Sequence, residues 1–136
     1  MRDRERYEAG MKVRRHILGN SHVDRAEARK TSVNREFQEL IVEYGWGEIW
    51  TRPGLDYRER RILVLGTMMG LGRWEEFRMH LRAALEGGMS LADITEVFLQ
   101  QAIYCGVPVA NTAHHHLEDI MKELQEKGVK LVGLED

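Results

Sequence analysis

Apolar residues recur with helical spacing in several blocks of the chain, and glycine, proline and polar residues separate the blocks. A first amphipathic helix is expected over residues 4–18, ending at Gly19. Residues 20–30 are polar and are expected to form a loop. Ser32 is expected to cap a second helix, whose apolar stripe stops at Gly45.

Four further helices are expected after this point. Asp56 begins a capping pattern for a helix that is apolar on nearly every side, so this helix is expected to lie in the core. Residues 72–88 hold the next helix, Ser90 caps the one after it, and Pro108 lies in the first turn of the last. The apolar tail, residues 128–136, is expected to pack against a neighbouring subunit. The pattern predicts an all-α fold of about six helices.

Composition narrows the class of protein. With 136 residues, 43% of them hydrophobic and 31% charged, the chain is expected to form one domain, residues 1–136. A net charge of −2 gives no electrostatic reason to bind nucleic acid or a membrane. No apolar run approaches the roughly 20 residues that span a bilayer, and the N-terminus has no apolar signal core. We therefore expect a cytoplasmic protein.

One helix carries a row of ionisable side chains. Arg73, Glu76 and His80 lie three and four residues apart, so on a helix they fall along one narrow strip. Beside that strip lies an apolar face formed by Trp74, Phe77, Leu81 and Leu85. The row has two interpretations: one wall of a pocket, or an ordinary solvated edge with salt-bridge spacing.

Residues 46–55 break the helical periodicity. Trp46 and Trp50 lie four residues apart, and Arg52 is followed by a turn-forming proline and glycine. This segment is expected to supply the apolar walls of a pocket and a guanidinium for a substrate carboxylate. The alternative is that the two tryptophans only fix an irregular loop to the core.

Three consecutive histidines, His114–His116, stand in the last helix. They resemble a metal-binding tract, but neighbouring residues on a helix point about 100° apart, so at most one or two of them face a common site. A metal centre formed by His80, Glu76 and one of the three is geometrically possible. The single cysteine, Cys105, excludes an intrachain disulfide and a Cys-x-x-Cys redox centre.

Three segments resemble the 4-carboxymuconolactone decarboxylases of aromatic catabolism: WGEIWTRPGL (46–55), HLRAALEGG (80–88) and AIYCGVPVAN (102–111). Their order and separations are similar, and the resemblance extends from about Arg6 to Leu124. The same superfamily contains the alkylhydroperoxidase D proteins. The resemblance implies a helical bundle like theirs and assembly into an oligomer, with a hexamer expected.

The resemblance also implies site residues. Arg52 lies in a hallmark segment and is expected to bind a substrate carboxylate. Tyr104, Cys105 and Asn111 lie on a signature segment and are expected near the pocket, with Cys105 as a small buried group and no nucleophile. His115 stands where the family often has a histidine. Its two histidine neighbours depart from the usual apolar residues and are expected to be surface or interface groups.

The implied reaction converts 4-carboxymuconolactone to the enol-lactone of 3-oxoadipate with release of carbon dioxide. The departing carboxylate is conjugated to the lactone carbonyl, so the substrate accepts its own electrons and no cofactor or metal is expected. Arg52 and Arg73 are expected to orient the dianion, and His80 to act as general acid. Glu76 is expected to orient the imidazole. Either His80 or Asn111 stabilises the oxygen on which charge develops.

Two other functions stay open. One is a peroxidase-like activity, which is disfavoured because Arg73 and Glu76 stand where alkylhydroperoxidase D proteins have a cysteine pair. The other is a non-catalytic helical assembly protein, in which His80 and its neighbours only satisfy one another. An open pocket lined by Arg52, Arg73 and His80 would favour the enzyme, and a closed ion-pair network would favour the assembly protein.

Overall fold

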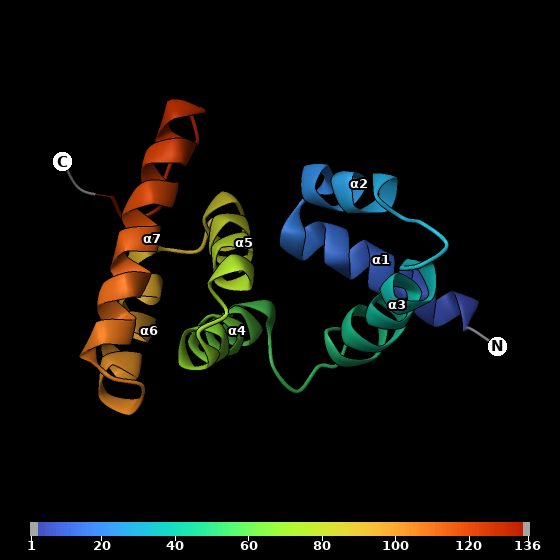
Figure 1. The fold of residues 1–136 in the computed structure, drawn as a ribbon, viewed down its shortest axis with the longest axis horizontal. Coiled ribbons are helices and arrows are strands. Elements are labelled where there is room, and N and C mark those ends of the chain that lie inside the picture. The colour runs from blue at the N-terminus through green and yellow to red at the C-terminus, as the bar shows by residue number, and fades with distance from the viewer. Residues whose placement is uncertain (1–2, 135–136) are drawn as a thin grey trace. The chain divides into compact units, whose positions relative to one another are not determined.

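The computed structural model describes residues 3–134, and every regular element in that range is helical. The predicted all-α class is therefore confirmed, with seven α-helices and one π-helical segment in the described range against about six helices expected. The chain divides into two compact units, unit 1 up to Tyr57 and unit 2 from Arg58 onward (Figure 1).

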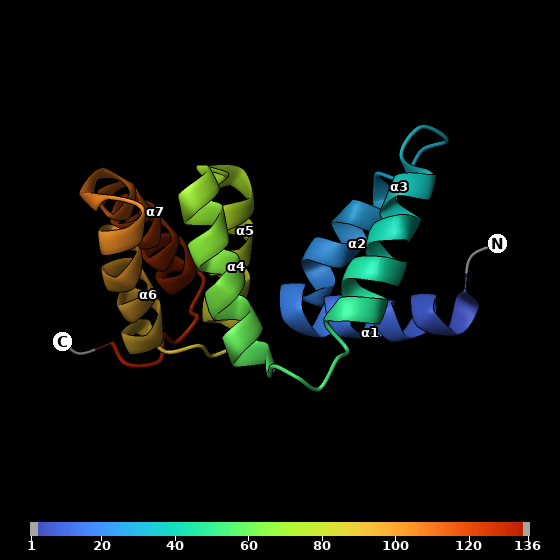
Figure 2. The same cartoon turned by 90° about the horizontal axis from the view of Figure 1, so that it is seen from below.

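Unit 1 contains four helical segments: α1 (Arg4–Leu18), α2 (Asn20–Ala28), α3 (Arg35–Leu40) and the π-helix η1 (Ile41–Ile49), which continues α3 without a break. The first helix has the predicted bounds, and its N-terminus is capped by the Asp3 side chain. In Figures 1 and 2, α2 runs back beside α1.

Glycines set the distance between α1 and η1. A Cβ added at Gly10 would overlap the carbonyl oxygen of Val42, and one added at Gly47 would overlap the carbonyl oxygen of Arg6. Because both obstacles are backbone atoms, neither can move without shifting a helix. Helices α1 and η1 therefore pack backbone against backbone.

The prediction of secondary structure from the sequence was wrong at three places in unit 1. Residues 20–30 were expected to form a loop, but most of them form α2, because Val23 is fully buried there and Asp24 pairs with Arg15 at 2.8 Å. Ser32 does not cap the second helix. Asn34 precedes α3 instead, and its side chain accepts a hydrogen bond from the Thr31 N–H at 2.8 Å.

The third error concerns the irregular segment. It was expected to begin at Trp46, but η1 extends to Ile49, so the first four residues of that segment, 46–49, lie inside a helix. The helix continues because Trp46 is buried, only 6% exposed, and its packing outweighs the two glycines that flank it.

Unit 2 contains α4 (Tyr57–Leu71), α5 (Trp74–Glu86), α6 (Leu91–Tyr104) and α7 (Val107–Glu126), with the first residue of α4 belonging to unit 1. Figure 2 shows α4 beside α5 and α6 beside α7. All four helices were predicted. The predicted cap is also present, since Ser90 accepts a hydrogen bond from the Asp93 N–H at 3.1 Å.

One continuous core holds unit 2 together. Phe77 and Phe98 lie at its centre, both fully buried, with ring centroids 5.9 Å apart. The expectation that α4 is buried on nearly every side was wrong, because Leu63 and Leu71 are 56% and 68% exposed. A helix in a unit this small can bury only one face.

The apolar tail packs on its own unit. Leu131 is buried in the core of unit 2, and the carbonyl oxygen of Val132 accepts a hydrogen bond from the Leu91 N–H at 2.9 Å. The expectation that the tail packs against a neighbouring subunit therefore fails for Leu131. Residues 135–136 of that tail lie outside the described residues.

None of the helices in the described part of the chain has both the length and the apolar character needed to cross a membrane.

Candidate active site

The predicted row of ionisable side chains lies at the start of α5. Arg73 was expected within the helix but is its N-cap residue, since α5 begins at Trp74. From there the Arg73 guanidinium reaches Glu76, with Nη2 3.1 Å from Oε1. Arg73 is exposed, and both Glu76 and His80, one turn further along, are partly buried. The row therefore begins at an exposed guanidinium and continues along a partly buried edge of α5.

Glu76 is held as a carboxylate. Its pKa is lowered, first by a hydrogen bond from its own backbone N–H at the start of α5, then by the hydrogen bond from Arg73. The charge of His80 lowers the pKa of Glu76 further. His80 thus has an anion one turn away and a guanidinium beyond it, which is a suitable arrangement for moving a proton near a bound anion.

The tryptophan segment is anchored in unit 1. The rings of Trp46 and Trp50 lie 4.8 Å apart, and the Trp50 ring lies 6.4 Å from that of Tyr57. Arg52 is exposed, and its backbone N–H donates to the carbonyl oxygen of Ile49 at 3.1 Å. These contacts fit the interpretation that the tryptophans fix the segment to their own unit. Their roles toward a substrate stay predictions.

The joint between α6 and α7 holds three more predicted residues. Tyr104 is 77% exposed and Asn111 is exposed. Cys105 is partly buried beside α4, where a Cβ added at Gly70 would lie 3.3 Å from its Sγ. Gly106, with φ of 104°, makes the turn into α7.

The three histidines of α7 diverge, as the helical spacing predicts. His114 donates from Nδ1 to the carbonyl oxygen of Ala110 at 2.8 Å, and its ring meets that of Phe98 edge-on at 4.9 Å. His115 is exposed. His116 accepts from Arg78 at 2.8 Å, and burial together with the Arg78 charge lowers its pKa.

His114 and His116 are therefore partly buried packing residues, which corrects the expectation of surface groups, while the alternative of interface groups stays a prediction. Their rings contact aromatic side chains of α6 and α5, and His116 lies 5.2 Å from Trp74. Within residues 3–134, no three His, Cys, Asp or Glu side chains converge in a way that would hold a metal ion.

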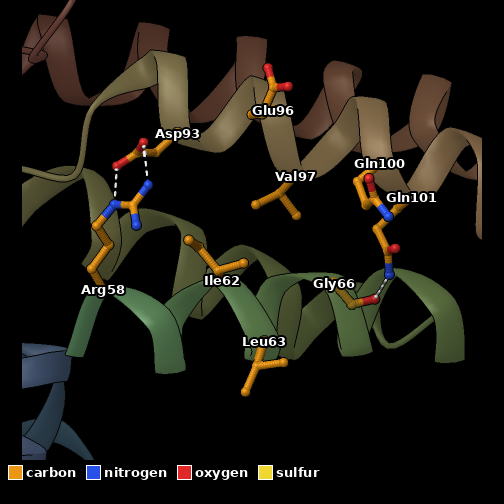
Figure 3. Close-up of a pocket in the computed structure, with 9 residues that line it drawn as sticks. All are labelled: Arg58, Ile62, Leu63, Gly66, Asp93, Glu96, Val97, Gln100 and Gln101. Atoms are coloured by element: carbon orange, nitrogen blue, oxygen red, sulfur yellow. Dashed lines mark hydrogen bonds and ion pairs between the residues drawn. The ribbon is translucent and has the colours of Figure 1, made fainter. Parts of the chain in front are cut away.

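Unit 2 also contains a pocket of about 400 Å³ between α4 and α6. Figure 3 shows Ile62 and Val97 pointing into the space between these helices, whereas Leu63 and Glu96 point away from it. The pocket is lined by Arg58, Ile62, Leu63, Gly66, Asp93, Glu96, Val97, Gln100 and Gln101. None of the site residues predicted from the sequence is among them.

The charges of this pocket do not suit a dianion. Arg58 is the single cation among the lining residues. Its Nε and Nη2 atoms donate to the two carboxylate oxygens of Asp93, at 2.8 and 2.9 Å. Glu96 adds a further negative charge. Sequence reasoning missed the pocket because Arg58 and Asp93 are 35 residues apart and no local pattern connects them.

A family model and a curated relative both match this chain over most of its length, and both carry the name carboxymuconolactone decarboxylase. Residues 35–119, from the start of α3 into α7, match the model of the carboxymuconolactone decarboxylase family. The chain is 38% identical over 124 residues to a 4-carboxymuconolactone decarboxylase from Acinetobacter baylyi, covering 91% of this chain and 92% of that protein.

Two further relatives bear on substrate. Over 125 residues the chain is 37% identical to a nitrosuccinic acid decarboxylase from Metarhizium robertsii, covering 92% of this chain and 87% of that protein. It is also 46% identical over 48 residues to a 4-carboxymuconolactone decarboxylase from Pseudomonas putida, covering 35% of this chain and 100% of that sequence.

Proposed function

We propose that this chain, which belongs to the carboxymuconolactone decarboxylase family, is a carboxy-lyase that acts on 4-carboxymuconolactone in the catabolism of protocatechuate. The observation that carries the proposal is the 38% identity to a decarboxylase of that name over nearly the full length of both chains. The Arg73, Glu76 and His80 row supports it, because it provides the charged groups that this chemistry needs.

The reaction places three demands on the protein. The bond to the departing carboxylate breaks, and its electron pair moves through the ring double bond to the lactone carbonyl oxygen. Carbon dioxide leaves as this bond breaks, and a proton then arrives at the carbon next to that carbonyl. The protein must hold the anionic substrate, stabilise the oxygen that gains charge, and deliver the proton.

We assign proton delivery to His80. Imidazole has an ordinary pKa of about 6.5, so it donates a proton readily near neutral pH. We propose that the Glu76 carboxylate one turn back favours the imidazolium form and orients the ring, which the mutual attraction of the two charges supports. Arg73 and Arg52 are proposed to attract the dianionic substrate and orient it in the site, and Asn111 to assist at the oxygen. Trp46, Trp50, Tyr104, Cys105 and His115 are proposed to line the substrate site.

A second substrate follows from the nitrosuccinic acid decarboxylase, which is about equally similar. Both names describe a small acid with two carboxyl groups and an electron-accepting group. A nitro group accepts the electron pair as a lactone carbonyl does, so the same acid catalyst serves both reactions. The shared requirement is a dicarboxylate that loses one carboxyl group and keeps the other.

We further propose that the chain works as one functional domain in a cytoplasmic hexamer. Apolar side chains that a single copy leaves exposed support assembly, since large apolar patches mark contact surfaces. In unit 2 these are Leu63, Leu71, Leu99, Ile103, Tyr104, Val107, Val132 and Leu134.

The test supplies each acid separately to the metal-stripped protein and follows its disappearance and the release of carbon dioxide. We expect 4-carboxymuconolactone, generated in place from its muconate precursor, to be consumed with a kcat/KM about 100-fold or more above that for nitrosuccinate. A higher kcat/KM for nitrosuccinate would make nitrosuccinate the preferred substrate in place of 4-carboxymuconolactone. Turnover of neither acid by folded protein, with metals restored, would overturn the proposal.

A further inference from the structure

The face of α5 that carries His80 continues to the end of the helix. Gly87, the C-cap residue of α5, lies seven residues after His80, which is nearly two full turns. The two positions therefore lie on the same face of the helix, about 10 Å apart along its axis. A Cβ added at Gly87 would lie 2.9 Å from Nη2 of Arg61, which comes from α4. The Arg61 guanidinium therefore lies against the far end of the His80 face.

Arg61 is a cation held in a partly buried position. Burial lowers its pKa, but a guanidinium keeps its charge at any physiological pH. It lies near the C-terminus of α5, where the helix dipole favours positive charge. The His80 face thus has Arg73 at its exposed beginning and the partly buried Arg61 beside its far end.

A decarboxylase needs its cations in the right place. A guanidinium that grips the departing carboxylate stabilises the substrate and loses that interaction as neutral carbon dioxide forms, which slows the reaction. The carboxylate that the substrate keeps stays charged throughout, so a guanidinium can hold it without this cost. The place for such a cation is away from the proton donor, as Arg61 is.

We infer that Arg61 binds the carboxylate that the substrate keeps, and so sets the preference for acids with two carboxyl groups. The inference rests on the proposed function. Gly87 is part of the same arrangement, because a side chain there would push the guanidinium out of its place. Its φ of −79° suits any residue, so a need for unusual backbone geometry does not explain the glycine.

The test is steady-state kinetics of Arg61→Met, which keeps length and apolar packing but removes the charge. Arg58→Met is the matched control: it removes another α4 guanidinium, one bound to Asp93. We expect Arg61→Met to raise KM about 30-fold with kcat within about 3-fold, and Arg58→Met to leave both near wild type. Arg61→Lys is expected to recover most of the loss.

Gly87→Ala gives a second measurement if Arg61→Met does not fold. The added Cβ lies closest to the end of the flexible Arg61 side chain, at 2.9 Å, and lies 3.1 Å from the Ala83 carbonyl oxygen, so the protein is expected to fold with KM raised about 3- to 10-fold. Turnover by wild type with unchanged KM in folded Arg61→Met or Gly87→Ala would overturn the role of Arg61 and leave the proposed function intact. A fall in stability with unchanged KM would assign Arg61 to capping α5 and overturn the inference. A wild type that does not turn over would overturn both.

Discussion

Glycines in the two units face different kinds of neighbour. In unit 1, a Cβ at Gly10 or Gly47 would overlap carbonyl oxygens of the opposing helix. In unit 2, a Cβ at Gly66 would meet the end of the Gln101 side chain at 3.0 Å, and one at Gly87 would meet the Arg61 guanidinium at 2.9 Å. Unit 1 therefore has a helix spacing fixed by backbone, and unit 2 has contacts made by side chains that can move.

This difference matters for function. Side chains that adjust can close around a ligand, whereas a backbone contact either fits or breaks. The charged groups of unit 2 lie on such adjustable contacts, with Arg61 from α4 meeting the end of α5 and Arg82 of α5 pairing with Glu123 of α7. We therefore expect small added side chains at the helix contacts to lower the free energy of unfolding more in unit 1 than in unit 2.

The largest effect is expected from Gly10→Ala in unit 1. The new methyl group overlaps the Val42 carbonyl, so α1 and η1 must separate, with an expected loss of about 3 kcal/mol in the free energy of unfolding. Urea unfolding followed by tryptophan fluorescence measures it, because Trp46 and Trp50 lie in unit 1. The control is Gly45→Ala, where nothing lies within 4 Å of the added Cβ, and it is expected to equal wild type or gain up to about 1 kcal/mol from helix propensity. Equal losses of stability in both variants would contradict the claim that the backbone contact at Gly10 fixes the spacing of α1 and η1.

A smaller effect is expected from Gly66→Ala in unit 2. The Gln101 side chain must move and weaken its hydrogen bond to the Gly66 carbonyl, now 2.9 Å, at a cost of about 1 kcal/mol. Alanine in a helix interior regains a similar amount. Urea unfolding is therefore expected to give a free energy within about 1 kcal/mol of wild type. A loss as large as that of Gly10→Ala would show that the contacts of unit 2 are as rigid as those of unit 1.

The smallest effect is expected from the α5–α7 ion pair. Arg82 donates to both Glu123 oxygens, at 2.6 and 3.2 Å, and this hydrogen bonding lowers the pKa of Glu123. Its stabilisation is therefore full above the unfolded pKa of about 4.5 and is lost as pH falls through the lower folded pKa. Both side chains are about one-third exposed, so the difference from Glu123→Gln at pH 7 is expected to be under about 1 kcal/mol. Urea unfolding from pH 7 to 3 measures it, and a difference that grows in acid would contradict the assignment.

Sequence reasoning located the helices of unit 2 because their signals are local. Ser90, the glycines around residues 72 and 88, and Pro108 each mark a helix end through their own backbone chemistry. In unit 1 it located α1 but missed α2, where the decisive interactions join distant residues. The burial of Val23, which stabilises α2, depends on the packing of other helices and leaves no local signal.

The candidate site was only partly readable for the same reason. Spacing alone placed Glu76 and His80 on one face, and the salt-bridge distance to Arg73 followed from it. Arg61 lies 26 positions before Gly87 and nothing in the sequence connects the two. Only the packing of α4 against the end of α5 brings the guanidinium to this face.

The most direct test of the account is the decarboxylation rate of His80→Ala. Helical circular dichroism first confirms that the variant folds, and enol-lactone formation from 4-carboxymuconolactone is then followed at saturating substrate. Loss of the general acid is expected to lower kcat about 100-fold or more relative to metal-stripped wild type. A folded His80→Ala protein with kcat within about 3-fold of wild type would contradict the assignment of His80 as proton donor.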